Sequence, residues 1–215
     1  MSTTETGYPV QFAVDYPDRP LNRLTSAFRI FTVIPIAIVL AALGHSYSSG
    51  SYDPNGNSWQ SSGGATAGLL VLAPALMIIF REKYPRWWFD FNFQMLSFMN
   101  RVGAYFVLLT DVYPATDEEQ SVHLEVPYPD AKEDLNRWFP LFKWFLAIPH
   151  YFILAFLILA AWVCIIIAWF AILFTGRYPK GLFDFVVGVG RWINRVTAYM
   201  LILTTDKYPP FSINP

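Results

Sequence analysis

Long apolar runs with few charged interruptions dominate the pattern of the chain. The first covers residues 24–43 and is interrupted by Arg29 and Pro35. After a Gly-, Ser- and Asn-rich loop over 44–66, a shorter apolar run covers 67–80. A helix needs about 20 apolar residues to cross the ~30 Å hydrocarbon core of a bilayer. The pattern therefore predicts a transmembrane helical hairpin with a long polar loop.

A second apolar stretch runs from Trp138 to Phe174, and only Lys143 and His150 interrupt it. At about 1.5 Å per residue, one helix of this length greatly exceeds a hydrocarbon core of ~30 Å. The stretch is therefore either two helices joined by a tight turn or one strongly tilted helix. The apolar pattern alone leaves both interpretations open.

Short motifs that occur twice favour the first interpretation. Before the polar loop the matched positions lie 114 residues apart, as for Pro35 and Pro149, and after it they lie 94 apart, as for Tyr84 and Tyr178. The difference equals a 20-residue insertion into the first loop. An internal repeat then predicts a second hairpin with its turn near residues 158–160. The other matched motifs are Leu21-Asn22-Arg23 with Leu135-Asn136-Arg137, Asn100-Arg101-Val102 with Asn194-Arg195-Val196, and an Asp-X-Tyr-Pro that closes each unit.

Two further elements flank each predicted hairpin. Alternating apolar residues over 10–17 and 122–129 are typical of strands, which are expected to pair unless the first is an extended N-terminal arm. The segments 86–109 and 180–204 each follow a Tyr-Pro that suits a helix start. Each helix has a narrow polar stripe, which lies in the membrane interface or turns toward protein. The stripes comprise Asp90, Gln94, Ser97 and Arg101 in the first helix, and Asp184, Gly188, Arg191 and Arg195 in the second.

Composition agrees with a membrane environment. The chain is 54% apolar and 14% charged, whereas a soluble domain has about 25% charged residues. A net charge of −1 and scattered Lys and Arg residues exclude a strongly basic nucleic-acid surface. The N-terminus lacks a basic region followed by an apolar core, so no cleavable signal peptide is expected. Internal segments are expected to drive insertion into the lipid bilayer.

Three segments carry a resemblance to a known family. They are WFLAIPHYFILAF at 144–156, AWFAILFTGRYPKGLFDFVVGV at 168–189 and RVTAYMLILTTDKYPPF at 195–211. They resemble uncharacterised bacterial membrane proteins with the domain of unknown function 4389, and through the repeat the resemblance extends to two tandem copies. The first copy is degenerate, since Ile36 stands where the second has His150. The resemblance implies a membrane fold and supplies no activity.

The predicted fold is a mainly α-helical membrane protein with two tandem repeats. Each repeat has a short β-strand, a transmembrane helical hairpin and an amphipathic interfacial helix. The expected boundaries are 8–114 for the first repeat, 115–121 for an acidic linker and 122–211 for the second repeat.

The distribution of basic residues predicts an orientation. The loop 44–66 contains no Lys or Arg, whereas basic residues flank the opposite ends of both hairpins. The positive-inside rule therefore places this loop outside and the termini in the cytoplasm, with parallel repeats and four spans in a bacterial cytoplasmic membrane. The basic-Tyr-Pro-basic clusters then mark the cytoplasmic interface. Four aromatic residues are expected to anchor at headgroup depth there: Tyr84, Trp87, Trp88 and Tyr178.

Charged residues within the apolar helices are the most costly in the chain. Arg29 and Lys143 occupy matched positions, and each either extends to the interface or needs a buried partner. Asp90 and Asp184 begin the interfacial helices at a similar depth. We therefore expect Asp90 to pair with Arg29 or Lys143, and Asp184 with the other, so that each pair clamps a helix against a hairpin.

Chemical motifs are sparse. The three histidines have no ligand spacing, and Cys164 lies in an apolar run where it behaves as a small hydrophobe. No phosphate loop, nucleophile elbow or catalytic triad context is recognisable. No catalytic residue, cofactor or metal ligand is therefore predicted.

The leading functional interpretation is a non-enzymatic integral membrane protein. It would be an accessory or scaffold subunit that packs against another integral membrane protein or against itself. The alternative is a transporter, channel or lipid-handling protein, and a membrane-bound enzyme comes third.

Overall fold

The structure is a computed structural model that describes residues 7–44, 65–116, 118 and 120–214. The polar loop predicted at 44–66 lies outside the described residues except at its two ends. We refer to residues 7–116 as the first half and 120–214 as the second half. The elements are β1 (Gln11–Val14), α1 (Arg23–Ala27), α2 (Arg29–Gly44), α3 (Ala65–Arg81), α4 (Arg86–Phe106), β2 (Val122–Glu125), α5 (Phe139–Leu146), α6 (Ile148–Thr175), α7 (Lys180–Thr197) and a π-helix η1 (Ala198–Ile202).

The two predicted strands form an antiparallel ribbon. Gln11 of β1 lies opposite Glu125 of β2, and Val14 lies opposite Val122. An isolated two-stranded ribbon is only marginally stable, and here helices support it, since α7 packs on β1 and α4 packs on β2. Each strand therefore packs on a helix of the other half. The predictions of a mainly helical fold and of paired strands are confirmed.

The second apolar stretch contains one long helix rather than a hairpin. α6 runs without a break through residues 158–160, so the turn predicted there is wrong. No Gly, Pro or polar turn residue occurs at these positions to end a helix. The helix begins next to Pro149, which the first turn tolerates. It ends at Gly176, whose φ of 76° and N–H bond to the Ile172 carbonyl form a left-handed C-terminal cap.

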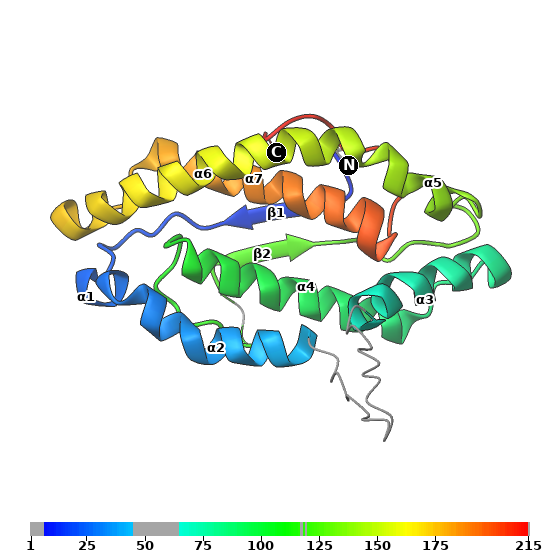
Figure 1. Ribbon diagram of the computed structural model, residues 1–215, viewed down its shortest axis with the longest axis horizontal. Coiled ribbons are helices and arrows are strands. Elements are labelled where there is room, and N and C mark those ends of the chain that lie inside the picture. Colours follow the sequence, from blue (N-terminus) through cyan, green and yellow to red (C-terminus); the bar gives the residue numbers. More distant parts are fainter. Residues whose placement is uncertain (1–6, 45–64, 117, 119, 215) are drawn as a thin grey trace, which may run out of the picture.

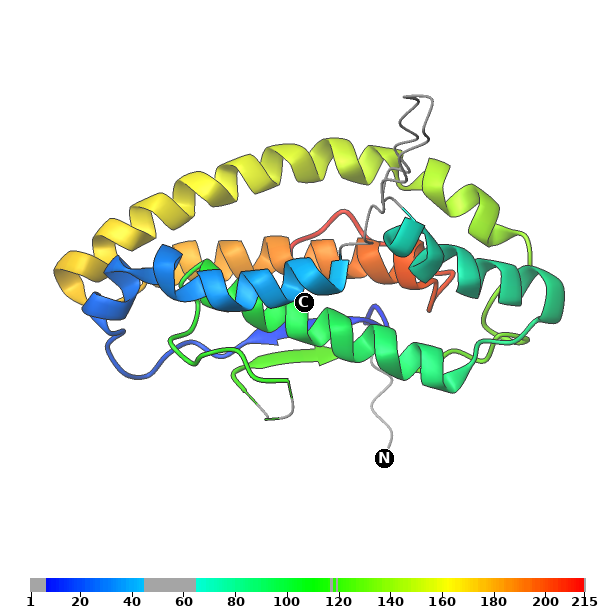
Figure 2. The same ribbon diagram turned by 60° about the horizontal axis from the view of Figure 1, so that its bottom comes forward.

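The first apolar stretch does not fold back on itself either. α2 packs on the second half of α4 through Val33 and Ile36, whereas Ile78 near the end of α3 packs with Phe89 near the start of α4. α2 and α3 therefore follow one another along the long axis of the molecule, as Figure 2 shows. The two helices bury side chains on different elements instead of on each other, since α2 packs on α4 and α3 packs on η1 and α5 of the second half.

The helices and strands form three layers. Figures 1 and 2 show α2, α3, α5 and α6 on one side of the molecule, the strands on the opposite side, and α4 and α7 between them. The packing of α6 on α7 and of α2 on α4 agrees with this order. We call the first layer the outer layer and the opposite side the strand side.

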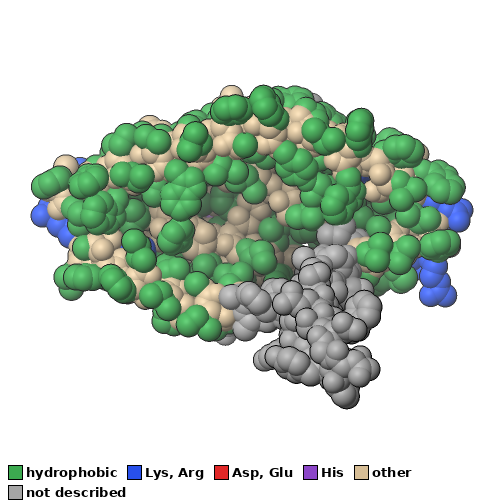
Figure 3. All heavy atoms as spheres, in the orientation of Figure 1, with side chains coloured by type: hydrophobic (Ala, Val, Ile, Leu, Met, Phe, Trp, Pro, Cys, Tyr) green, Lys and Arg blue, Asp and Glu red, His purple; other side chains and the backbone are tan. Residues whose placement is uncertain are grey.

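The outer layer exposes a broad apolar surface. In Figure 3 hydrophobic side chains cover the outer layer, and Lys and Arg appear at the two ends of the long axis. Phe145, Phe152 and Phe174 are 76%, 69% and 79% exposed. Among the described residues, α6 is the one helix long and apolar enough to cross a membrane. The four predicted spans are thus replaced by one helix of spanning length and shorter apolar helices.

Candidate functional site

A buried ion pair joins Arg29 at the start of α2 to Asp111, which follows α4. Arg29 is 3% exposed, and its Nη2 contacts Oδ1 of Asp111. The guanidinium carbon also lies 4.0 Å from the centroid of the Tyr105 ring. The second carboxylate oxygen of Asp111 accepts a 2.7 Å hydrogen bond from the backbone N–H of Asn22. Asp111 therefore connects α2 with the residue that caps the N-terminus of α1.

A second buried ion pair joins Lys143 of α5 to Asp206. Lys143 is 1% exposed, and its Nζ lies 2.7 Å from Oδ1 of Asp206. The same ammonium donates a 2.8 Å hydrogen bond to the Thr205 carbonyl and lies 5.0 Å from the centroid of the Tyr199 ring. The second oxygen of Asp206 accepts a hydrogen bond from the backbone N–H of Asn136. This cation is therefore neutralised and hydrogen-bonded within the chain.

The two ion pairs use residues from matched motifs. Each has a cation before the matched proline, a tyrosine whose ring face contacts the cation, and an aspartate from the Asp-X-Tyr-Pro motif. In each, the aspartate also binds the backbone of the asparagine in the Leu-Asn-Arg motif. The chain therefore builds the same arrangement twice, once with arginine and once with lysine.

The prediction that Asp90 and Asp184 pair with these cations is wrong. Both are exposed, and Asp111 and Asp206 occupy the partner positions instead. Asp90 lies fifteen residues before Tyr105 on α4, which is about 22 Å along a helix. Because Arg29 lies on Tyr105, Asp90 cannot reach it. The repeated Asp-X-Tyr-Pro motif was the signal in the sequence for Asp111 and Asp206. Its spacing alone did not identify these aspartates as partners of the two cations.

A π-helix compensates for one extra residue in the second half. Tyr105 precedes Asp111 by six residues, whereas Tyr199 precedes Asp206 by seven. η1 absorbs the additional residue directly after Tyr199. Both segments then turn through a leucine with positive φ, 67° at Leu108 and 60° at Leu203. Each aspartate thereby returns to the cation on the tyrosine ring. Single-turn π-helices of this kind are frequent at functional sites.

The three arginines of the predicted polar stripes contact protein. Arg101 donates to the Ala115 carbonyl at 2.8 Å, and Arg195 donates to the Asn214 carbonyl at 2.9 Å. Arg191 donates to the Phe12 carbonyl on β1 at 3.1 Å, and Gln94 is exposed beside β2. Of the two alternatives for the stripe, contact with protein is the one observed for the three arginines. They fix the ribbon and the segment that ends each half.

The predicted interface anchors divide into two groups. Tyr84 and Tyr178 are 4% and 1% exposed, so their side chains are internal rather than on the surface, and burial raises the pKa of both phenols. The Tyr84 hydroxyl donates to the Ile202 carbonyl at 2.6 Å. Trp87 is exposed and Trp88 is half-buried at the end of the molecule, so these two remain available to a membrane surface.

The two Tyr-Pro loops join the halves to each other. The Tyr16 hydroxyl of the first half donates to the Tyr178 carbonyl of the second half. The Tyr128 hydroxyl of the second half donates to the Tyr84 carbonyl of the first half. These reciprocal bonds explain why Tyr84 and Tyr178 are internal: their loops are fixed by a tyrosine from the other half.

His150 lies in an aromatic cluster within the second half. Its ring is fully buried, accepts a 3.1 Å hydrogen bond at Nδ1 from Trp192 Nε1, and stacks on Phe211 at 4.2 Å between centroids. With Nδ1 as acceptor, the proton of the neutral ring is on Nε2. In the described part of the chain, no cluster of three or more His, Cys, Asp or Glu side chains is arranged to hold a metal ion.

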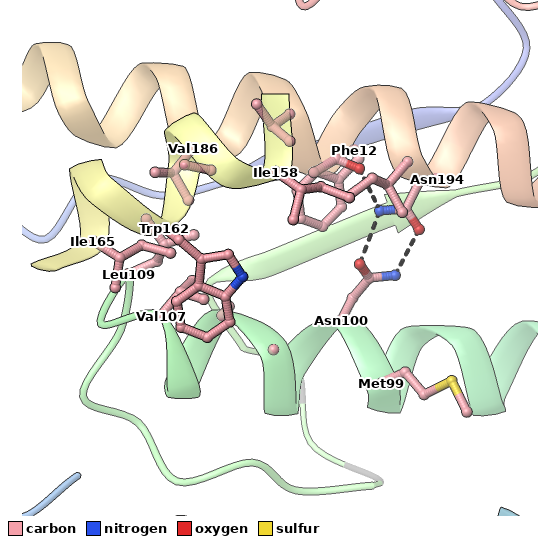
Figure 4. Close-up of a pocket in the computed structure, with 16 residues that line it drawn as sticks. Phe12, Met99, Asn100, Val107, Leu109, Ile158, Trp162, Ile165, Val186 and Asn194 are labelled. Carbon is pink, nitrogen blue, oxygen red and sulfur yellow. Dashed lines mark hydrogen bonds between the residues drawn. The ribbon is translucent and has the colours of Figure 1, made fainter. Parts of the chain in front are cut away.

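A cavity of about 240 Å³ lies between the two halves (Figure 4). Residues of α4, α6 and α7 line it, together with Phe12 of β1. Asn100 and Asn194 meet at one edge of the cavity, and each side-chain amide donates to the oxygen of the other, at 2.7 and 2.8 Å. These asparagines come from matched motifs, so the central contact between the halves is reciprocal as well.

The segment that contains the second ion pair matches a known family. Residues 138–212 match a domain of unknown function, DUF4389. Neither a curated protein nor a solved structure matches the chain. The match supports the family resemblance for one copy, and it does not extend to the two tandem copies predicted.

The DUF4389 segment contains most of the second half. It begins just before α5 and continues beyond η1, so it includes Lys143, Tyr199 and Asp206. It also includes His150 and the long helix α6. β2 and Asn136 precede it, so the backbone N–H that binds Asp206 comes from outside the matched region.

Proposed function

We propose that the chain is a non-enzymatic membrane protein whose outer layer lies in the hydrocarbon of a bilayer while its strand side faces water. The observation that carries this proposal is the exposure of α6. Its buried residues form one stripe of His150, Leu154, Ala161, Ala168 and Ile172. The rest of this helix presents apolar side chains around most of its circumference. Exposure of this apolar surface to water would cost roughly 25 cal/mol of free energy per Å².

The strand side sets the orientation within the membrane. Asp15 Oδ2 and His123 Nε2 lie 2.9 Å apart there, with side chains 66% and 54% exposed, and the Glu125 carboxylate is exposed beside them. A bilayer crossed along the long axis would bring these charges into hydrocarbon, where each costs several kcal/mol. A molecule that lies in the plane of the membrane keeps them in water. We therefore propose that α6 lies along the membrane plane.

The proposal includes two tandem copies, with the boundaries 8–114 and 122–211. The paired motifs support it, because both halves contribute an apolar outer helix, a middle helix, a strand and the same ion pair. Both halves turn their outer helices to the same side, which agrees with parallel copies. Basic residues at both ends of the long axis then reach anionic headgroups. By the positive-inside rule, the strand side and both termini are proposed to be cytoplasmic in a bacterial membrane.

Within this arrangement we propose an accessory or scaffold role, in contact with another integral membrane protein or with a second copy. The buried charges support a structural role, because both are neutralised inside the chain and lie in separate halves rather than along one route. The alternative of a lipid-handling protein retains one specific observation in its favour. The cavity between the halves is apolar except for the asparagine pair and the indole N–H of Trp162.

The embedding can be tested by site-directed spin labelling. Cysteines would replace Phe152, Val163 or Phe170 on the outer side of α6, or His123 on the strand side, in a Cys164→Ser background. In liposomes, the α6 labels should collide with oxygen and be protected from a water-soluble nickel chelate, at similar depths along the helix. The His123 label should collide with the chelate. A depth profile that is water-exposed at both ends of α6 and deepest in the middle would replace in-plane insertion by a spanning helix.

The scaffold role needs a separate measurement. Native mass spectrometry of gently extracted protein should give a complex of defined stoichiometry, either with a second membrane protein or with further copies. A monomer that carries only lipid would favour the lipid-handling alternative.

A further inference from the structure

We infer that the cavity between the halves holds one hydrocarbon chain of a membrane lipid. This inference rests on the proposed membrane embedding and adds a binding site to it. The cavity lies between α4 on one side and α6 and α7 on the other, with Phe12 of β1 at its inner end. Val186 and Val189 of α7 line it and are 7% and 3% exposed, so a bilayer lipid reaches them only by entering the cavity.

The chemistry of the lining selects an apolar occupant. The polar side chains of its lining are Asn100, Asn194 and, at the entrance, the indole N–H of Trp162. The four amide N–H donors of the two asparagines are already used. Each amide donates one hydrogen to the other asparagine and one to the carbonyl four residues earlier, on Leu96 or Gly190. Apart from the Trp162 indole at the entrance, a polar ligand would therefore find no free donor among these side chains. Its other polar groups would stay unsatisfied, which is costly in an apolar site.

The size of the cavity favours a single chain. A volume of about 240 Å³ lies below the ~300–1,000 Å³ typical of pockets for drug-sized ligands. It is still far larger than the ~30 Å³ of one water molecule, and apolar cavities tend to stay dry. A segment of one alkyl chain is apolar and small enough for this volume. A sterol or a whole phospholipid is too large for it.

The entrance faces the outer layer. Met99 of α4, and Ile158 and Trp162 of α6, line the cavity and are 41%, 38% and 45% exposed. The cavity thus opens between α4 and α6, and in Figure 4 Trp162 extends across the space between these two helices. Phe106 contacts Trp162 edge-on at 5.9 Å between centroids and bounds the opening. With the outer layer in hydrocarbon, the opening is continuous with the lipid chains.

Gly103 keeps the entrance wide. It lies in α4 on the lining, and a Cβ placed there would meet no atom within 4 Å. Glycine is unfavourable in the interior of a helix, and no close neighbour requires it at this position. A larger side chain at residue 103 would therefore enter the cavity without displacing the backbone. Gly181 of α7 has the same open surroundings and does not line the cavity, which makes it a matched control.

The experiment uses the full-length protein in nanodiscs that contain phosphatidylcholine with a diazirine on one acyl chain. After irradiation, peptide mass spectrometry identifies the labelled residues. The wild type should be labelled at Val186 and Val189 as well as at Phe152 and Phe170 on the outer side of α6. In Gly103→Leu the labels at Val186 and Val189 should fall to the level of samples without probe, while the α6 labels persist. Gly181→Leu should resemble the wild type.

The outcomes separate this inference from the proposed function. Label on outer α6 without label at Val186 and Val189 in the wild type overturns the lipid-chain site and leaves the embedding intact. Label at the two valines without label on outer α6 supports the site and contradicts the embedding. If Gly103→Leu fails to fold, Ala161→Leu fills the cavity from the opposite wall. Unchanged valine labelling in a folded filled variant also overturns the site.

Discussion

The Lys143 ammonium lies 2.7 Å from the Asp206 carboxylate, at the point where the segment after η1 returns to α5. Arg29 and Asp111 form the corresponding contact in the first half. In both halves the ion pair therefore fixes the beginning of the apolar outer segment to the end of the middle helix. Both cations are almost completely buried, and a buried cation that loses its partner is strongly destabilising.

The first prediction concerns the Lys143–Asp206 pair. Asp206→Ala should lower the free energy of unfolding by ~3 kcal/mol or more, because it leaves the Lys143 ammonium buried without a counter-charge. Asp184→Ala is the matched control, and because Asp184 is exposed its effect should stay within about 0.5 kcal/mol. The measurement is denaturant unfolding of the detergent-solubilised protein. Equal losses in the two variants would mean that Asp206 does not stabilise Lys143.

The second prediction concerns rescue of the same site. Lys143→Met in the Asp206→Ala background should recover most of the lost stability, since an apolar side chain of similar length removes the stranded charge. The melting temperature of the double variant should exceed that of Asp206→Ala alone. A double variant that melts lower than both single variants would show that the lysine stabilises through its other contact, with the Thr205 carbonyl.

The third prediction concerns the asparagine pair between the halves. Asn100→Leu alone should destabilise by ~1–3 kcal/mol, because it leaves the amide of Asn194 without one of its partners in a largely apolar site. The double variant Asn100→Leu/Asn194→Leu should cost less than the sum of the single variants. A double-mutant cycle measured by denaturant unfolding gives this coupling. Strictly additive losses would argue against a direct amide contact.

The fourth prediction concerns the extra residue in η1. Deletion of Leu201 reduces the sequence separation of Tyr199 and Asp206 to six positions, which is the separation of Tyr105 and Asp111. The shortened segment should adopt the α-helical path of the first half and keep the ion pair, with only a small fall in melting temperature. Deletion of Val187, within regular α7, should be far more damaging because it rotates the rest of that helix. Similar losses for both deletions would assign the π-helix a role beyond spacing.

The fifth prediction concerns the end of α6. Gly176 has a φ of 76°, so Gly176→Ala should destabilise by ~1 kcal/mol through the left-handed conformation alone. A Cβ at this residue would meet its nearest neighbours, Arg23 and Pro20, at 3.6 Å, which is ordinary contact. Gly181→Ala at the start of α7 is the control and should be neutral or stabilising. Thermal unfolding compares the two variants.

Several features of the fold were determined by the sequence alone. Alternation over 10–17 and 122–129 predicted the ribbon, since a period of two marks a strand in any surroundings. A polar stripe predicted the middle helices α4 and α7 in the same way. The matched positions of Arg29 and Lys143 also predicted that these two cations belong to equivalent sites. Such signals are local, because residues within one element carry them.

The tertiary structure decided which elements meet. α6 is apolar around most of its circumference, so its sequence contained no face to say whether it continues or folds back, and the insertion in the first half suggested a turn that the second half lacks. The partners of Arg29 and Lys143 were decided by where the chain returns after α4 and η1. Tyr84 and Tyr178 became internal because tyrosines of the other half bind their loops. An apolar or charged side chain specifies that it needs a partner, and only the packing of distant segments specifies which partner it obtains.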